Sequence, residues 1–282
     1  MGEEEAVVTT AVKDSKCFFW TIKIGNNTAF LVGSMHLMQE DMHPLPDKFE
    51  NAFSVSTVIV FEANMEEANT YELRQYVQSL GFYPPGETIW RDISQDTREK
   101  LLEKLSEMQF PVKMAEKIRP WLLSNMLEDK AEDYSEFRHT LGLDACFLKK
   151  ARHEGKKFMF LESARDQVDC TAKMPASQQE FLLEDALRDE LSEGEIPLNE
   201  VIELWKNGEA DTLEFHYRDH HRKQMGIYQD IIINRNRRWL KKIEELFQLG
   251  ENVMIIVGGG HMGGPDGLVR LLANKGYQIV QE

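Results

Sequence analysis

The sequence predicts an α/β protein in which a central mixed, largely parallel sheet is flanked by helices. Short apolar runs rich in β-branched and aromatic residues recur along the chain, as is typical of strands buried on both faces. Helical stretches between these runs dominate by residue count. Because no low-complexity linker separates the segments, we predict a single domain over residues 1–282 with helical insertions at about 66–140 and 178–248.

The expected strands follow one another from the start of the chain. CFFWTIKI and TAFLVG flank the turn Gly25-Asn26-Asn27 and predict a β-hairpin whose second strand ends at Gly33. VSTVIVFE (55–62) and KFMFLE (157–162) predict buried strands that each end in a glutamate. VMIIVG (253–258) and GYQIV (276–280) predict two more buried strands, which are joined by the helix PDGLVRLLANKG and therefore parallel.

Helices are expected over TYELRQYVQSL, over Thr97 to about Asp129 with interruptions at Pro111 and Pro120, over LDACFLKKARHEG and over most of 178–248. Within the last stretch, residues 180–214 are strongly acidic and the segment from Arg218 to Lys242 is basic. We interpret both as solvated faces of a long helical hairpin. Four aromatic residues recur at helical spacing with apolar neighbours and are predicted to be core residues: Trp121, Trp205, Tyr228 and Trp239.

The charge excludes one class of partner. With 33 Lys+Arg against 48 Asp+Glu, the formal charge of -15 argues against nucleic-acid binding through a basic surface. A content of 42% hydrophobic residues excludes intrinsic disorder. The apolar runs are far shorter than the roughly 18 residues that a membrane helix requires, so we expect no membrane span.

The start of the sequence and its cysteines do not decide the cellular compartment. The start Met1-Gly2-Glu3-Glu4-Glu5 is acidic, where a secretory signal would be basic and then apolar. Either the protein stays inside the cell, or this is a mature form whose signal has been removed. Cys17, Cys146 and Cys170 are widely spaced and odd in number, so we expect free thiols rather than disulfides or a zinc knuckle.

Polar side chains stand where the expected strands end. One strand runs into Gly33-Ser34-Met35-His36 and another into Gly258-Gly259-Gly260-His261, so that both finish in Gly-x-x-His. Glu62 and Glu162 end two further strands. Because the carboxyl ends of parallel strands meet at one edge of a sheet, we expect His36, Glu62, Glu162 and His261 to converge there.

Two imidazoles and one carboxylate suffice to hold a divalent transition metal while leaving positions for water and substrate. We therefore predict a metal site made by His36, His261 and Glu62. The alternative for Glu62 is an ion pair with an arginine, because an unpaired carboxylate at the end of an apolar strand would be costly. Arg165 stands three residues after Glu162 and could neutralise it, so we expect Glu162 to support the site from outside rather than to bind the metal. We expect the same supporting role for Ser34, Gly33 and Gly258.

Two other patterns compete with this interpretation. Gly258, Gly260 and Gly263 satisfy the dinucleotide-binding pattern Gly-x-Gly-x-x-Gly, although His261 would hinder the close approach of a phosphate. His216 and His220 have the helical spacing of a zinc-binding pair. The neighbouring cations Arg218, Arg222 and Lys223 would repel an ion, so we interpret the cluster of His216, His220 and His221 as surface residues.

At these residues the chain resembles the TraB/GumN/PrgY family, which includes the Tiki metalloproteases, and it looks most like the bacterial GumN-type branch. The resembling pieces follow in order over nearly the whole chain: FLVGSMHL, VIVFEAN, KIRPWLLSNML, LGLDACFLKKARHEGKKFMFLES with Gln167 behind it, IINRNRRWLKKI and IVGGGHMGGPDGLVRLLANKGYQIV. The last piece is distinctive by itself, and the ordered set is specific. Ser34 stands where many members have threonine.

This resemblance implies an erythromycin-esterase/ChaN-like fold and peptide-bond hydrolysis. It implies a divalent metal, manganese or cobalt with zinc as an alternative, bound by His36, His261 and Glu62. It also places Arg235 and Asn236 at the site as catalytic polar groups. We predict a metal-dependent peptidase in which Glu62 is the third ligand or the general base, and Arg235 or Asn236 stabilises the oxyanion.

The alternative function is a non-catalytic protein that binds or sequesters a peptide or haem in the same cleft. The expected partner is a peptide or protein substrate, and the expected state is a monomer or homodimer. Many bacterial members of the family are exported or lipid-anchored. We therefore expect the cell envelope if a signal was removed, and the cytoplasm otherwise.

Overall fold

The computed structural model describes residues 15–64, 70–133, 135–188, 192–193 and 196–282. The acidic start of the sequence, on which the expectation about a signal depends, lies outside these residues. No helix in the described ranges combines the length and the apolar character needed to cross a membrane.

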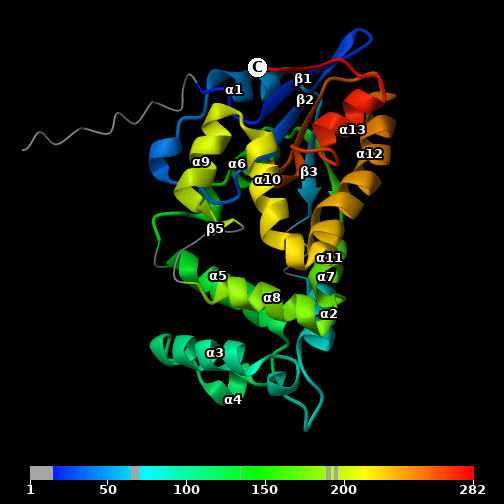
Figure 1. The fold of residues 1–282 in the computed structure, drawn as a ribbon. Helices are drawn as coiled ribbons and strands as arrows, with labels where there is room; N and C mark the ends of the chain where they lie inside the picture. Colours follow the sequence, from blue (N-terminus) through cyan, green and yellow to red (C-terminus); the bar gives the residue numbers. More distant parts are fainter. Residues whose placement is uncertain (1–14, 65–69, 134, 189–191, 194–195) are drawn as a thin grey trace, which may run out of the picture.

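A six-stranded mixed sheet forms the centre of the molecule (Figure 1). Its strands are β1 (Phe19–Ile24), β2 (Asn27–Ser34), β3 (Val58–Ala63), β4 (Lys157–Glu162), β7 (Val253–Gly258) and β8 (Ile279–Gln281), in the order β4-β3-β7-β2-β1-β8. The four neighbours β4, β3, β7 and β2 are parallel, whereas β1 is antiparallel to both β2 and β8. The predicted α/β fold class with a largely parallel sheet is confirmed.

The register of the parallel strands places their carboxyl ends at one edge. Ser34 pairs with Gly258 across β2 and β7, and Ala63 pairs with Glu162 across β3 and β4. The predicted hairpin is also confirmed, with Gly25 in the left-handed region at a φ of 57° between β1 and β2. The segments that end in His36, Glu62, Glu162 and His261 therefore finish side by side.

The expectation that all these strands are buried on both faces is wrong for β4 and β8. Both are edge strands, and Met159 in β4 and Val280 in β8 are 39% and 59% exposed. β8 runs in the same direction as β7, as expected, but β2 and β1 lie between them. The connecting helix α13 is shorter than predicted, because it begins at Leu268, after Pro265.

Helices cover both faces of the sheet (Figure 1). On one side lie α1 (Asp47–Val55), α6 (Leu143–His153) and α9 (Leu198–Asn207), and on the other lie α12 (Asn234–Phe247) and α13 (Leu268–Asn274). Trp205 of α9 and Trp239 of α12 are fully buried in the main core. Trp121 and Tyr228 are buried as well, so all four aromatic residues predicted as core are core residues.

A second layer of helices lies beyond the carboxyl ends of the parallel strands (Figure 1). It contains α2 (Tyr71–Gly81), α3 (Gln95–Glu107), α4 (Val112–Ala115), α5 (Pro120–Asp133), α7 (Ala164–Ala172) and α8 (Ala176–Ala186). Most of them share a separate hydrophobic core around Leu101, Leu123 and Leu183. The helices break at Pro111 and Pro120 as predicted.

The long helical hairpin expected over 178–248 is wrong. The region is divided into α8, the short strands β5 (Ser192–Glu193) and β6 (Ile196–Pro197), α9, α10 (Ala210–His220), α11 (Met225–Tyr228), a π-helix (Gln229–Ile233) and α12. α9 starts directly after Pro197 and ends at Gly208, whose φ of 77° stops the helix. The charged faces are not wholly solvated either, because Glu214 and Arg235 are buried. The division into one domain with two insertions stays a prediction.

The glycines after β7 allow close packing against α10. A Cβ on Gly263 would lie 2.0 Å from the carbonyl oxygen of Ala210, a contact that backbone atoms cannot relieve. A Cβ on Gly260 would have Ile232 Cδ1 as its nearest neighbour, at 3.8 Å. Packing therefore accounts for Gly263 of the Gly-x-Gly-x-x-Gly pattern without a bound phosphate.

We predict that Gly263→Ala lowers the free energy of unfolding by about 1–3 kcal/mol, because the added methyl group pushes α10 away from the end of β7. Gly260→Ala is the matched control and should have little effect on stability. Urea unfolding followed by circular dichroism measures both. Equal stability of the two variants would contradict this packing.

Candidate functional site

Gly258, at the carboxyl end of β7, lies where the predicted site residues meet. A Cβ built on Gly258 would stand 2.9 Å from Nε2 of His36, 3.4 Å from Oε2 of Glu62 and 3.6 Å from Cδ2 of His261. A side chain at position 258 would therefore fill the space that the three groups share. The structure brings together side chains from three neighbouring strand ends, although His36 and His261 lie far apart in the sequence.

Arg235 of α12 joins this cluster to Glu162. Its Nε donates hydrogen bonds to Oε1 and Oε2 of Glu162 at 3.1 and 3.3 Å, and its Nη2 donates to Oε1 of Glu162 at 2.6 Å. Nη2 also donates to Oε1 of Glu62, and Nη1 lies 3.2 Å from Nε2 of His261. The ion pair with an arginine that was the alternative for Glu62 is thus present.

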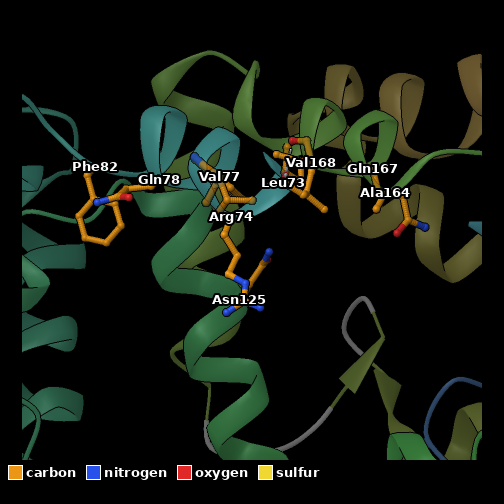
Figure 2. Close-up of a pocket in the computed structure, with 11 residues that line it drawn as sticks. Leu73, Arg74, Val77, Gln78, Phe82, Asn125, Ala164, Gln167 and Val168 are labelled. Carbon is orange, nitrogen blue, oxygen red and sulfur yellow. Dashed lines mark hydrogen bonds between the residues drawn. The ribbon is translucent and has the colours of Figure 1, made fainter. Parts of the chain in front are cut away.

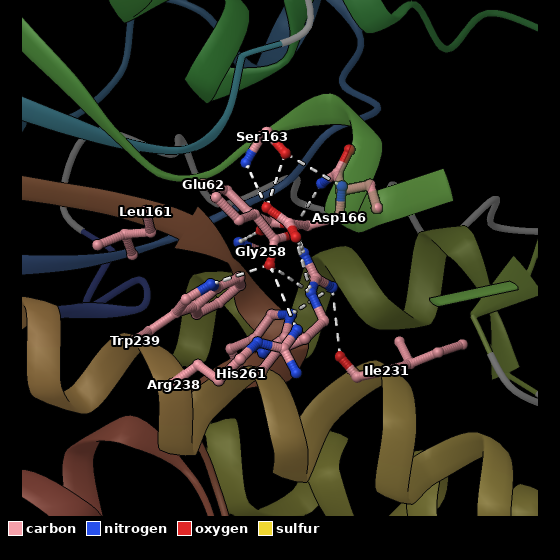
Figure 3. A network of polar contacts seen from close by, with 12 residues as sticks. Glu62, Leu161, Ser163, Asp166, Ile231, Arg238, Trp239, Gly258 and His261 are labelled. Carbon is pink, nitrogen blue, oxygen red and sulfur yellow. Dashed lines mark hydrogen bonds and ion pairs between the residues drawn. The ribbon is translucent and has the colours of Figure 1, made fainter. Parts of the chain in front are cut away.

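The expected neutralisation of Glu162 by Arg165 is wrong. The Arg165 guanidinium stacks on the ring of Tyr76 at 3.8 Å, because α7 turns that side chain toward α2. Glu162 is buried and is held instead by Arg235 and by the indole N–H of Trp239, which donates at 3.0 Å. Figure 3 shows Glu62, Trp239 and His261 pointing toward the same place from three elements.

The two glutamates differ in their electrostatics. Burial would raise the pKa of Glu62, but Arg235, the two histidines and the Gly258 N–H together outweigh it and hold that pKa well below its usual range. The Gly258 N–H donates to Oε2 of Glu62 at 2.9 Å, and Gln167 Nε2 donates to Oε1 at 3.0 Å. Burial raises the pKa of Glu162, which Arg235 opposes. Glu62 is therefore a carboxylate at neutral pH.

The proton on His261 can be placed from its neighbour Asn236. The amide Nδ2 of Asn236 donates to the carbonyl oxygens of His261 and Asp266, at 3.2 and 2.9 Å, so Oδ1 is the atom that faces His261 Nδ1 at 2.7 Å. Nδ1 consequently carries the proton, and Nε2 is an acceptor. Burial and then the nearby Arg235 lower the pKa of His261 to about 3, so the ring is neutral.

His36 is oriented in a similar way by Asp144 of α6. Its Nδ1 lies 3.2 Å from Oδ2 of Asp144, and the side chain is 42% exposed, so the site opens to solvent here. Ser34 donates to Oδ1 of Asp144 at 2.8 Å. Burial would raise the pKa of Asp144, but the contacts with His36 and Ser34 outweigh it and lower that pKa. Ser34 therefore acts on His36 through Asp144.

Gly33 and Asn236 have positions that the sequence did not specify. A Cβ on Gly33 would lie 2.7 Å from Cβ of Phe18, and its carbonyl accepts from the Trp205 indole at 2.7 Å, so Gly33 is a packing position behind the site. Both polar ends of Asn236 are engaged with His261 and Asp266, and the residue is fully buried. Asn236 therefore positions His261.

Sequence reasoning missed Asp144 and Trp239 as members of the site. Asp144 lies in the resembling segment LGLDACFLKKARHEG, but no spacing links it to His36. Trp239 was expected only as core, and its ring lies 4.5 Å from that of His261 and 4.6 Å from the guanidinium of Arg235. The signal for Trp239 was its spacing of four residues from Arg235 on one helix.

The donor types at the site, imidazole nitrogen and carboxylate oxygen, are those that divalent cations accept. Both imidazoles hold their Nδ1 against an acceptor, which is the arrangement that fixes metal-binding histidines with Nε2 toward the ion. Glu62, Glu162 and Asp144 outnumber the buried Arg235, and the half-exposed Arg238, 3.9 Å from Glu162, offsets part of the excess. Within the described ranges, however, no three His, Cys, Asp or Glu side chains stand in the arrangement of a metal site.

The interpretation of His220 and His221 as surface residues is wrong. Both are buried, because α10 turns them toward α8, where His220 Nε2 lies 2.6 Å from Asp185 Oδ2. Nδ1 of His221 lies 2.7 Å from the carbonyl oxygen of Tyr217, and Phe181 packs against both rings. His216 contacts Phe215 and is partly exposed. The cluster thus joins two helices.

Burial makes His221 sensitive to acid. Desolvation lowers its pKa, so the folded chain keeps the ring neutral while the unfolded chain takes up a proton as the pH falls below about 6.5. The contribution of this neutral ring to the free energy of unfolding should therefore be fully present above that pH and decrease below it. We predict that His221→Phe reduces the slope of unfolding free energy against pH by at most about 1.4 kcal/mol per pH unit.

Urea unfolding between about pH 4 and pH 8 measures this slope, and His153→Phe at an exposed position is the control. An unchanged slope in His221→Phe would show that the imidazole does not titrate with unfolding.

The comparison with known protein families covers nearly the whole chain. The TraB/PrgY/gumN family matches residues 18–281, which include every residue of the site. The chain belongs to the TraB/PrgY/gumN family. The family predicted from the sequence is thereby confirmed.

Two relatives of this TraB/PrgY/gumN family member are both named as uncharacterized proteins. This chain is 22% identical over 248 residues to "Uncharacterized protein YbaP" of Shigella flexneri, and the match covers 88% of this chain and 89% of the relative. The YbaP protein of Escherichia coli (strain K12) matches with the same identity and coverage. No solved structure matches this chain.

Proposed function

We propose that the protein is a metal-dependent peptidase in which His36, His261 and Glu62 hold a divalent ion. The observation that carries this proposal is the convergence of all three groups on Gly258, with Nδ1 of each imidazole directed at its own acceptor. Manganese or cobalt is the proposed ion, and zinc is an alternative with the same nitrogen and oxygen donors. The reaction class follows from the resemblance to the Tiki metalloproteases.

A divalent ion at such a site would polarise the carbonyl of a peptide bond and make water acidic enough to attack it. The chain itself keeps Glu62 ionised and in place through Gly258, Gln167 and Arg235. Glu62 therefore serves as the third ligand or as the general base that accepts the proton of the attacking water. The exposed side of His36 is the route by which a substrate reaches these groups.

Arg235 has a second role in the proposal. Its Nε and Nη2 are anchored on Glu162. This anchor keeps the guanidinium beside His261 when its contacts with Glu62 and His261 are replaced by a contact with the substrate. A fixed cation at that position can stabilise the developing oxyanion, a contribution of about 3 kcal/mol when well aimed. Asn236 does not take this role in the proposal, because its amide is used to orient His261.

The proposal is tested by incubating the purified chain with a peptide library and Mn²⁺ or Co²⁺, and by identifying products with mass spectrometry. We expect cleavage that a chelator abolishes. His36→Gln and Glu62→Gln should each lower the rate by about 100-fold or more, since they remove a donor or the base. His153→Gln, at an exposed position away from the site, is the matched control and should cleave normally.

Circular dichroism must show that each variant is folded before its rate is compared. Cleavage that persists with chelator, or that survives in folded His36→Gln, would contradict a metal-dependent mechanism at this site. The control variant excludes loss of activity through a general effect of replacing histidine.

Asp144 provides a separate prediction about metal affinity. In Asp144→Asn the residue keeps its size but loses the charge that holds the proton on Nδ1 of His36, so Nε2 is less often available as a ligand. We expect the affinity for Mn²⁺ to fall by about 10-fold to 100-fold, measured by isothermal titration calorimetry. Asp219→Asn, exposed on α10, is the control. Unchanged affinity for Mn²⁺ in Asp144→Asn would contradict the proposal that Asp144 orients His36 for metal binding.

The contacts of Arg235 support a second candidate, a peptide-binding protein that does not hydrolyse its ligand. The guanidinium already satisfies Glu62 Oε1 and faces His261 Nε2, so an internal cation stands where the proposed ion would bind. Stoichiometric peptide binding, with no cleavage and no heat on addition of Mn²⁺ or Co²⁺, would favour this candidate over the peptidase.

A further inference from the structure

A cavity of about 510 Å³ lies between α2, α5 and α7. Figure 2 shows Leu73 and Val77 of α2, Asn125 of α5 and Val168 of α7 around this space. Phe82 and Trp121 add aromatic rings to its lining, and Arg74 and Gln167 add polar groups. Its volume is within the range of about 300–1,000 Å³ that is typical of ligand pockets.

The cavity adjoins the cluster around Gly258. Gln167 lines the cavity and also donates a hydrogen bond to Oε1 of Glu62 at 3.0 Å. Ala164, another lining residue, is the first residue of α7 and follows Glu162 by two positions. A peptide that is bound at Gly258 would therefore reach the cavity by following Glu62 and Gln167, over a few residues of extended chain at about 3.4 Å each.

The chemistry of the lining selects the type of side chain. Most of the surface is apolar, formed by aliphatic residues and the rings of Phe82 and Trp121. Among the described lining residues Arg74 is charged, and none is an aspartate or glutamate, in a chain whose formal charge is -15. The cavity therefore favours an apolar group and disfavours the basic side chains that an acidic surface would attract.

We propose that this cavity binds a large apolar side chain, such as leucine, methionine or phenylalanine, of a peptide whose backbone lies at the Gly258 cluster. This proposal rests on the function proposed above for the nature of the ligand. The amides of Gln167 and Asn125 provide polar groups at the cavity for the peptide backbone. The helical layer beyond the sheet thus selects the peptide.

The test uses two fluorescein-labelled peptides, one with leucine and one with alanine at a single central position between glycines. Their binding to the chelator-treated full chain is measured by fluorescence anisotropy, so that no hydrolysis is required. We expect the leucine peptide to bind at least about 10-fold more tightly, as burial of its larger side chain allows. Val77→Trp, which fills the cavity from α2, should reduce this preference to less than about threefold.

Ser79→Trp is the matched control, because Ser79 is exposed on the same helix and does not line the cavity. Val168→Phe fills the cavity from α7 and replaces Val77→Trp if that variant does not fold. A leucine preference that the filled variants lose and Ser79→Trp keeps supports the proposal, whether or not the chain cleaves peptides. Equal binding of the two peptides, or a preference unchanged by filling, overturns it even if cleavage is observed.

Discussion

The buried guanidinium of Arg235 between Glu62 and Glu162 is the interaction on which the arrangement of the site depends. Removing charges from water costs several kcal/mol per ion, and these groups recover that cost only when their partners are in place. The pairing ties α12 to the ends of β3 and β4, and the contact with His261 extends it to β7. Loss of Arg235 would leave both carboxylates without the cation that they share.

The parallel strands supply the geometry that this network needs. Four neighbouring strands finish at one edge, so residues from both ends of the chain meet there without long loops. The orientation of each imidazole is then set by an acceptor outside the sheet, Asp144 on α6 and Asn236 on α12. The helices on the two faces of the sheet therefore determine the chemistry available at its edge.

Much of this arrangement could be predicted from the sequence because strand ends are marked by local patterns. Buried apolar runs located β2, β3 and β7, and parallel neighbours implied that His36, Glu62 and His261 converge. The exposed edges of β4 and β8 could not be predicted, because edge position depends on the order of strands. Asp144, and the burial of His220 and His221, depend on contacts between helices that no spacing in the sequence records.

Whether Arg235 is the resident cation of the cluster or the neighbour of a metal ion decides between a peptide-binding protein and a peptidase. The most direct measurement is Mn²⁺ titration of the chelator-treated chain, with free ion detected by electron paramagnetic resonance. The metal-site account predicts one bound ion per wild-type chain and none in the double variant His36→Gln/His261→Gln. Absence of binding in the wild type, or equal binding in both proteins, would contradict it.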